Sequence, residues 1–381
     1  MRHAVRSKHV IVYMLSIALS SLPLSACRTI NPKTNDNTGH HVSRDYYREQ
    51  SIGADALYTP ASAFFHYTLD TLQLPENFDT DNFSDNLSQV WEHLSHPRTA
   101  IDNEGGFRRF INREIFPIDP DHHRDSFAAL PNYGLHFLGD GIAYRRDVEW
   151  FSSRGYRYPR LVAASLAMVS EFLQEALEVQ NTTDADPVAD VYLFRPLGLL
   201  LFSHQGFADW VQQHLAPAIW PTISAWNLST DQFTNTGISY IYRPPRLSFR
   251  QSGLFVHTGL NNLIGLSHHL PSGRSISWGL GAAVQEIIRQ RNIQADVRAS
   301  FGLFLDQDKS LLASMVLNDV GKTRFRINLY PGALPLPKGI GVFLSMDDER
   351  DLSAGFTYQF PIGLATGQQH QRSNDGADRN E

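Results

Sequence analysis

The sequence predicts an α+β protein: an N-terminal helical domain followed by an antiparallel β-domain that forms a small barrel of about eight strands. One change of pattern along the chain leads to this fold class. Up to about Trp220 the apolar residues recur at the spacing of amphipathic helices, and after Gly237 they alternate with small or polar residues. The composition, 42% hydrophobic and 19% charged over 381 residues, is sufficient for a buried core.

The chain begins with the layout of a secretory signal. Arg2, Arg6 and Lys8 form a basic start, and the apolar run over 10–19 is too short to act as a stop-transfer helix. The run ends in Leu24-Ser25-Ala26-Cys27. We therefore expect residues 1–26 to be a signal peptide.

Cys27 is the only cysteine, which excludes an intrachain disulfide. The segment Leu24 to Cys27 resembles the lipobox of bacterial lipoproteins, in which the cysteine becomes the lipidated first residue. This resemblance implies lipidation at Cys27, and Arg28 in place of an aspartate favours the outer membrane. The alternative is a plain signal-peptidase cut beside an unmodified cysteine.

The polar segment 27–53 is expected to be a flexible tether from the lipid. The helical domain is then expected over 54–220. Apolar spacing predicts its helices, and Pro196 is expected to kink or split one of them. The predicted helical ranges are 61–72, 83–94, 107–115, 133–151, 160–179, 190–202, and 207–215 continued by 218–220.

The β-domain is expected over 237–363, with a polar tail over 364–381. Strand 352–360 shows the pattern most clearly, because Leu352, Phe356 and Phe360 share one face while Ser353 and Thr357 share the other. Short polar turns separate the strands. The predicted strands are 237–243, 246–259, 262–270, 276–284, 295–305, 311–318, 324–329, 340–346 and 352–360.

This alternation fits two environments. In an outer-membrane barrel the apolar face would lie outward against lipid, which predicts that Leu280, Leu344 and Phe356 point outward. In a soluble sheet the same face would pack on the helices. The small residues of the opposite face suit a narrow lumen, so the membrane barrel is favoured over the soluble sheet.

Ionisable residues in the helical half occur in pairs four apart, which share one face of a helix. His136 and Asp140 form one pair, Glu171 and Glu175 a second, and Asp190 follows Asp186 in a third. Two carboxylates on one apolar helix require a compensating metal, arginine or shared proton. His136, Asp140, Glu171, Glu175 and Asp190 are therefore the candidate site residues.

These residues support two interpretations. One is a His/Asp/Glu site that binds a divalent metal or performs acid–base hydrolysis. The other is a buried polar network in which nearby arginines, among them Arg195, act as salt-bridge partners. This second interpretation is favoured because the sequence contains no His-Glu-x-x-His, Gly-x-Ser-x-Gly or phosphate-loop motif. The sequence requires no cofactor and leaves a divalent metal possible.

One stretch of the chain resembles an uncharacterised helical domain of bacterial envelope proteins. The stretch contains Asp121-His122-His123, the helix with Glu171 and Glu175, and the segment from Asp190 through Pro196-Leu197-Gly198. The resemblance covers 121–202. It implies a helical domain in front of a C-terminal β-barrel, and it implies no reaction.

Charge and compartment exclude a nucleic-acid partner, since the formal net charge is −6 and no basic block stands out in the mature chain. The expected partners are membrane lipid, through the anchor, and an envelope lipid or protein. The sequence thus favours a non-catalytic structural or binding protein of the outer membrane. The alternative is a hydrolase or transferase that acts on an envelope lipid or glycan through the five candidate residues.

Overall fold

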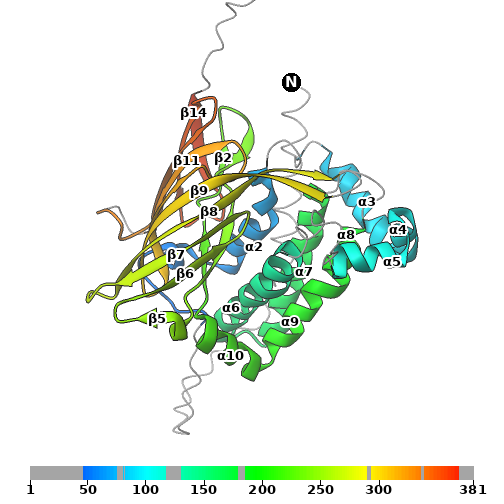
Figure 1. The fold of residues 1–381 in the computed structure, drawn as a ribbon, viewed down its shortest axis with the longest axis horizontal. Helices are drawn as coiled ribbons and strands as arrows, with labels where there is room; N and C mark the ends of the chain where they lie inside the picture. Colours follow the sequence, from blue (N-terminus) through cyan, green and yellow to red (C-terminus); the bar gives the residue numbers. More distant parts are fainter. Residues whose placement is uncertain are drawn as a thin grey trace, which may run out of the picture.

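The structure is a computed structural model that describes residues 46–74, 80, 82–116, 130–178, 185–289, 293–335 and 339–368. Helices come first along the chain, and a curled, mostly antiparallel sheet follows (Figure 1). The predicted α+β class with N-terminal helices is therefore confirmed. Cys27, the segment Asp121-His122-His123 with Asp125, and the tail beyond Gln368 lie outside the described residues.

The helices follow the predicted apolar pattern closely. The helices over Pro97–Glu104 and Asp186–Ala189 were not predicted. Ala218–Trp220 was expected to extend a helix and instead forms a strand. The helix ends because Ala216 adopts a left-handed backbone (φ 44°) and Pro217 has no amide hydrogen to continue it. The described helices are η1 (Ala54–Leu57), α2 (Pro60–Thr68), η2 (Asp70–Gln73), α3 (Phe83–Ser95), α4 (Pro97–Glu104), α5 (Phe107–Phe110), η3 (Ile111–Ile115), η5 (Leu130–Gly139), α6 (Asp140–Ser153), α7 (Pro159–Glu178), α8 (Asp186–Ala189), η6 (Asp190–Phe194), α9 (Arg195–Ser203) and α10 (Gln205–Leu215).

Three of these elements, η3, η5 and η6, are π-helices, in which each amide bonds one residue further back than in an α-helix. The expected division at Pro196 is found: the π-helix η6 ends at Phe194, and α9 begins at Arg195 with the proline at its second position.

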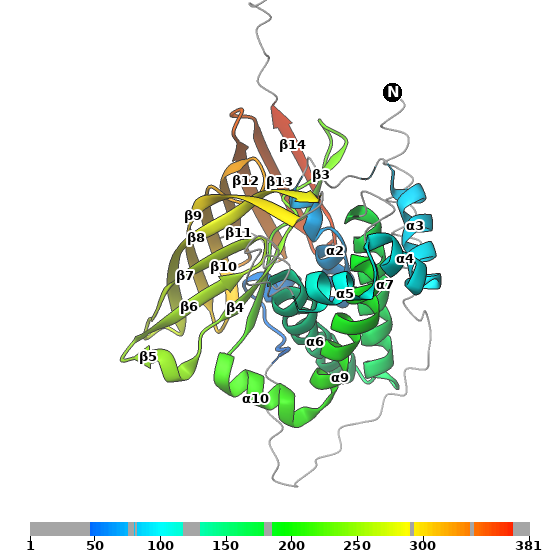
Figure 2. The same ribbon diagram turned by 45° about the vertical axis from the view of Figure 1, so that its right-hand side comes forward.

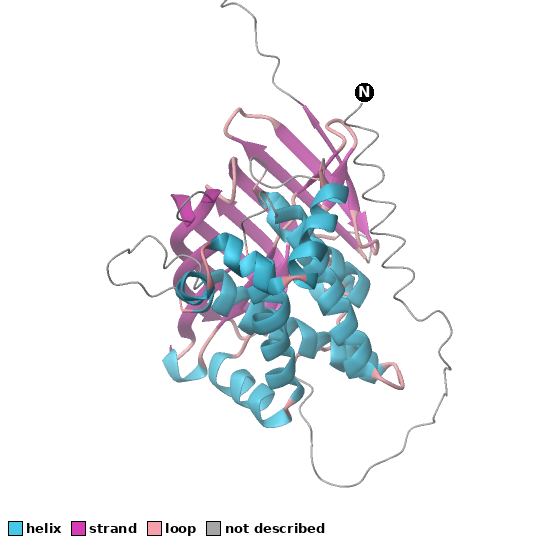
Figure 3. Cartoon of the chain, turned by 90° about the vertical axis from the view of Figure 1, so that its right-hand side faces the viewer, coloured by secondary structure: helices cyan, strands magenta, loops and turns pink. Residues whose placement is uncertain are grey.

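The helices α6, α7 and α9 pack together beside the sheet, and α2 lies between α7 and the curled strands (Figures 2 and 3). One apolar cluster joins the two layers. It includes Phe64 and Phe65 of α2, Leu173 of α7, and Ile238 and Tyr240 of the sheet. The helical part and the sheet therefore share a core.

The strands match the predicted alternation, and the sheet also recruits residues before 237 and after 363. The described strands are β1 (Ala218–Pro221), β2 (Ala225–Asn227), β3 (Gln232–Thr234), β4 (Ile238–Tyr242), β5 (Ser248–Phe249), β6 (Ser252–Thr258), β7 (Asn261–His269), β8 (Arg274–Arg289), β9 (Ile293–Gln307), β10 (Ser310–Leu317), β11 (Thr323–Leu329), β12 (Ile340–Asp347), β13 (Leu352–Tyr358) and β14 (Gly363–Gln368). A short 3-10 helix, η7 (Pro245–Leu247), precedes β5.

The strands pair in the order β1-β4-β6-β7-β8-β9-β10-β11-β12-β13-β14-β2-β3, and β5 pairs with β6. Both ends of this path involve one short segment, 218–227. Its first part, β1, pairs with β4, and its second part, β2, pairs in parallel with β14. The other pairings in this path are antiparallel, for example Gly265 opposite Gly279 between β7 and β8.

The predicted closed barrel of eight strands is wrong. The structure is a curled sheet of more strands, a half-barrel, with η1 and α2 on its concave side (Figure 2). Period-2 alternation determines which face each side chain takes, but it does not determine how many strands pair or whether the sheet closes. Gly53 bonds the connection between β11 and β12, since its N–H donates to Pro331 O at 2.6 Å.

The two faces of the sheet differ sharply. The concave face is filled by buried aromatic side chains, among them Trp220, Phe255, Phe304 and Phe343. Large apolar side chains on the opposite, convex face remain accessible, and those more than a third exposed are Ile264, Leu266, Ile276, Trp278, Leu280, Val297, Leu303, Leu317, Leu344, Leu352, Phe356, Tyr358 and Leu364.

The predicted outward direction of Leu280, Leu344 and Phe356 is confirmed, since 56%, 39% and 49% of their surfaces are exposed. We call the exposed set listed above the convex apolar face. None of the described helices combines the length and the apolar character that a crossing of the bilayer requires.

The last residues of the expected tether are part of the fold. Tyr46 and Tyr47 donate their backbone N–H groups to one carboxylate oxygen of Glu149, at 3.1 and 3.0 Å. The Tyr46 hydroxyl also donates to Ala208 O at 2.6 Å. These bonds fix the point at which the described chain begins, beside α10.

Candidate functional site

The five candidate residues lie together in the helical part. His136 is on η5, Asp140 begins α6, Glu171 and Glu175 are on α7, and Asp190 begins η6. All five side chains are buried, and His136 is the most accessible at 8%. The i,i+4 pairs thus point into one common interior cluster, as the helical spacing predicted.

Glycines allow the elements of the cluster to approach closely. A side chain at Gly139 would meet the ring of Tyr240 at 2.4 Å, and one at Gly198 would meet the backbone oxygen of Phe137 at 2.5 Å. The absence of a side chain at Gly139 therefore allows η5 to approach β4 closely. It brings the Tyr240 hydroxyl of β4 to Asp140, where it donates to Oδ1 at 3.0 Å.

The imidazole of His136 lies between three carboxylates. Its Nδ1 is 3.3 Å from Glu171 Oε1 and 3.5 Å from Asp140 Oδ2, and its Nε2 is 3.7 Å from Asp190 Oδ2. Burial lowers the pKa of His136, but the charges of Asp190 and Glu171 outweigh it and raise that pKa well above its usual range. The ring is therefore a cation wherever these carboxylates are ionised.

Arg195 is the second cation of the cluster and is almost completely buried. It contacts Asp140 Oδ2 at 2.9 Å and donates a very short hydrogen bond to Glu171. Burial raises the pKa of the Glu171 carboxyl, but Arg195 and His136 outweigh it and lower the value to about 2. Glu171 is thus a carboxylate at every physiological pH.

Glu175 and Asp190 behave in the opposite way. Burial, and then the neighbouring carboxylates Glu178 and Asp190, raise the pKa of Glu175 well above its usual range. Burial also raises the pKa of Asp190, against the attraction of His136. Both groups are therefore poised to hold protons or to exchange them for another cation.

Glu175 Oε2, Asp190 Oδ1 and Arg195 Nε have no hydrogen-bond partner among the described residues, whereas His136 Nδ1 and Glu171 Oε1 meet each other only as an ion pair at 3.3 Å. The pairing with arginines and backbone groups that a purely structural network requires is therefore incomplete. His136, Glu171 and Asp190 each direct one ligand atom to the same place, with these atoms all within 4.8 Å of one another.

Two members of the site carried little signal in the sequence. Arg195 was expected only as one of several salt-bridge partners, although its position directly after the Asp190 helix turn indicated its proximity. Tyr240 lies 100 residues from Asp140 in the chain, on a strand, and no local pattern connects the two.

A scan against protein-family models, a search of curated proteins and a search of solved structures each found no match to this chain.

Proposed function

We propose that this protein is a lipid-anchored component of the bacterial outer membrane whose helical part binds a divalent metal ion. The observation that carries the metal proposal is the convergence of His136, Glu171 and Asp190, with ligand atoms within 4.8 Å, from three separate helical elements. The carboxylates of Asp140 and Glu175 lie in the same cluster.

The charge of the cluster supports a divalent cation. Asp140, Glu171, Glu175 and Asp190 share one interior region with the bases His136 and Arg195, and the buried acids Glu178 and Asp186 act on the same groups. The acids outnumber the bases, and buried negative charge without compensation is costly. A divalent ion would offset part of this charge, and on binding it would displace the proton of His136 and those that otherwise remain on Glu175 and Asp190.

The donor set also indicates the kind of metal. An imidazole with carboxylates suits Zn²⁺ or Mn²⁺ better than the all-oxygen ligation of Ca²⁺. Tetrahedral zinc with bonds of about 2.0–2.1 Å places its ligand atoms roughly 3.3 Å apart, so the three side chains need only local adjustment. Asp140 would hold Arg195 beside the centre, as outer carboxylates do in other metal sites.

The test is a calorimetric titration of the full chain, freed of metal by a chelator, with Zn²⁺ and with Mn²⁺. Asp190→Asn keeps the shape of the side chain and removes a charged ligand, so the affinity should fall about tenfold to a hundredfold. Glu92→Asn, an exposed acid on α3, is the control and should bind as the unaltered chain does. Equal affinity in Asp190→Asn and the unaltered chain would rule out the metal centre.

The placement in the envelope rests on the signal layout at Cys27 and is consistent with the convex apolar face. Contiguous apolar surface of this extent is unusual on a monomer that meets only water. We propose that acyl chains of the membrane cover it. Metabolic labelling with a fatty acid, compared between the unaltered chain and Cys27→Ala, tests the anchor, and equal label in both would refute it.

The hydrolase or transferase is the second candidate, and Glu175 favours it. Three protein ligands leave coordination positions open on a metal, and a neighbouring carboxyl with a raised pKa can transfer protons. Such an enzyme would act on an envelope lipid or glycan. Glu175→Gln should then retain metal binding and lose turnover of a phospholipid or peptidoglycan fragment; turnover that survives this change would exclude Glu175 as the proton-transfer group.

A further inference from the structure

An exposed turn at one end of the sheet combines apolar and basic side chains. The turn, over 245–251, contains η7 and β5 and leads into β6. Leu247 and Phe249 are 60% and 75% exposed, and Arg246 and Arg250 beside them are exposed as well. The stretch contains no acidic residue. We call these four side chains the η7–β5 patch.

The backbone holds this patch in its exposed position. β5 pairs with the start of β6, and the Leu247 N–H donates to Pro244 O at 3.0 Å. Arg250 adopts a left-handed conformation (φ 55°) in the turn between the two strands. Its guanidinium lies 5.3 Å from the centre of the Phe249 ring, within the range of a cation–π contact. The turn is therefore formed before any partner binds.

The patch is continuous with other exposed apolar surface. Leu247 and Phe249 line a shallow groove of about 490 Å³ together with Leu266 of β7, which belongs to the convex apolar face. The helix α10 packs against η7, and its Trp210 is 51% exposed. That indole stacks on the ring of His214, with the ring centres 4.8 Å apart. Exposed aromatic rings with a polar group are typical of membrane–water interfaces.

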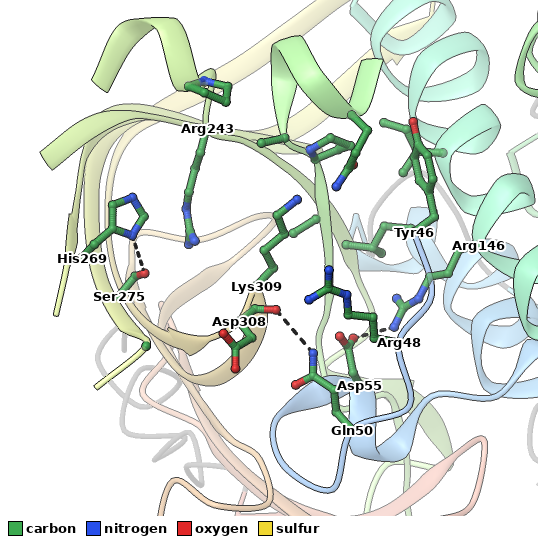
Figure 4. Close-up of a pocket in the computed structure, with 18 of the residues that line it drawn as sticks. Tyr46, Arg48, Gln50, Asp55, Arg146, Arg243, His269, Ser275, Asp308 and Lys309 are labelled. Atoms are coloured by element: carbon green, nitrogen blue, oxygen red, sulfur yellow. Dashed lines mark hydrogen bonds and ion pairs between the residues drawn. The ribbon is translucent and has the colours of Figure 1, made fainter. Parts of the chain in front are cut away.

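The described chain begins at this same end of the molecule. Tyr46 and Ser248 line one cavity, of about 410 Å³. Figure 4 shows Gln50 at that cavity, where its Nε2 donates to the Asp308 O of the turn between β9 and β10 at 3.3 Å. Cys27 precedes Tyr46 by 19 residues (46 − 27), which span at most roughly 65 Å. An acyl anchor on Cys27 would therefore keep the η7–β5 patch close to a bilayer.

We propose that the η7–β5 patch contacts the surface of an anionic lipid bilayer, with Leu247 and Phe249 among the headgroups and Arg246 and Arg250 at lipid phosphates. This inference rests on the envelope location proposed above. A bilayer offers an apolar interior below a layer of phosphates, and the patch has the matching order of apolar side chains flanked by a cation on each side. The long arginine side chains can reach the phosphates while the apolar pair enters more deeply.

The test measures how the full chain sediments with lipid vesicles. Every chain carries Cys27→Ala, so that no acyl anchor contributes and the N-terminal segment is the same throughout. Vesicles of mixed phosphatidylglycerol and phosphatidylcholine are compared with vesicles of phosphatidylcholine alone. We expect the anionic vesicles to bind at least about tenfold more tightly, since each arginine at an anionic surface contributes about fivefold.

Paired variants assign the binding to the two parts of the patch. Leu247→Ser with Phe249→Ser should weaken binding to both kinds of vesicle at least about tenfold, because the apolar contact is lost. Arg246→Glu with Arg250→Glu should remove the preference for anionic vesicles and leave binding to phosphatidylcholine nearly unchanged.

The matched controls lie on α3, α4 and α5, across the molecule from β5 (Figure 1). Trp91→Ser with Phe107→Ser replaces two apolar side chains that are 66% and 67% exposed. Arg98→Glu with Arg108→Glu reverses two exposed arginines. Both controls should bind vesicles as the chain with Cys27→Ala alone does.

A second measurement reports the position of the patch itself. Because Cys27 is the only cysteine, Cys27→Ala with Phe249→Cys gives one thiol for an environment-sensitive dye. With anionic vesicles we expect the dye emission to shift to shorter wavelength and to become protected from quenching by iodide. The same dye on Trp91→Cys should remain accessible to iodide.

Several outcomes would overturn the proposal. The Cys27→Ala chain could fail to bind anionic vesicles, the two serine changes could leave binding intact, or the dye at position 249 could stay accessible to iodide. Equal losses in the control variants would show general adsorption. A chain that is dimeric in solution and becomes monomeric with the two serine changes would make the patch a protein interface. None of these results depends on the metal centre or on lipidation of Cys27.

Discussion

Arg195→Leu tests whether the buried cluster is organised around one arginine. Arg195 Nη2 lies 2.9 Å from Asp140 Oδ2, and the guanidinium also bonds Glu171. With an effective dielectric constant near 20, attraction at 2.9 Å is about 6 kcal/mol before the cost of removing the arginine from water. Breaking a buried pair from one side typically costs about 3–5 kcal/mol, and we expect a loss in that range.

The loss should depend on pH in a defined direction. Because the folded-state pKa of Glu171 is lowered to about 2, its stabilising contribution is complete above the unfolded-state pKa near 4.5 and disappears as the pH falls through 2. The deficit of Arg195→Leu should therefore be largest near pH 7 and should shrink between pH 4.5 and pH 2.

The assay is urea unfolding of the full chain in the presence of a chelator, compared at pH 7 and pH 3. Arg98→Leu removes a surface arginine that is 94% exposed, and it should change the free energy of unfolding by at most about 1 kcal/mol. The double variant Arg195→Leu with Glu171→Leu should recover part of the loss, because no buried charge is left without its partner. A loss below about 1 kcal/mol for Arg195→Leu at pH 7 would refute this account of the cluster.

Three further predictions concern the rest of the fold. Burial raises the pKa of Asp70 to about 7, so the folded state retains a proton that the unfolded state releases near pH 3.8. The free energy of unfolding should therefore fall as the pH rises between these values. Asp70→Asn should flatten this part of the plot of urea-unfolding free energy against pH, and an unchanged slope would contradict the prediction. Gly198→Ala should lower the free energy of unfolding by about 1–3 kcal/mol in the same assay, because the added methyl would meet the Phe137 backbone oxygen at 2.5 Å. The comparison is Gly155→Ala, which has a positive φ and open space around it, so that this change measures backbone strain alone. Leu280→Lys should leave the unfolding midpoint in detergent-free buffer nearly unchanged, because the side chain is exposed there. In a bilayer the same change should cost about 2–4 kcal/mol of stability. If the variant is as stable as the unaltered chain in the bilayer as well as in buffer, lipid does not cover the convex apolar face.

The sequence predicted the longer elements of this fold well because they have a strong local period. The alternation of Leu352 with Ser353 and of Leu344 with Ser345 was sufficient to orient both strands correctly, since side-chain direction in a strand depends only on parity. The number of strands and the curled, half-barrel form were not predictable in this way. They depend on pairings such as that of β14 with β2, which no local pattern contains.

The candidate site was predictable to the same extent. His136, Asp140, Glu171 and Glu175 converge because residues four apart share a helix face, which the sequence displays. The hydrogen bond from Tyr240 to Asp140 could not be predicted from the sequence, because it depends on how β4 packs against α6. The π-helices that present His136 and Asp190 were also not predicted, since the apolar spacing of a π-turn differs too little from that of an α-helix.

The pairing of the segment 218–227 with both ends of the sheet has a consequence for the order of events during synthesis. β2 emerges from the ribosome more than 130 residues before its parallel partner β14, which is the last described element of the chain. The pairing has a large loop-closure entropy and cannot form until translation is almost complete. Until then β2 and β13 present open hydrogen-bonding edges, so a nascent or truncated chain that ends before Gly363 should be prone to strand-mediated aggregation and dependent on a chaperone.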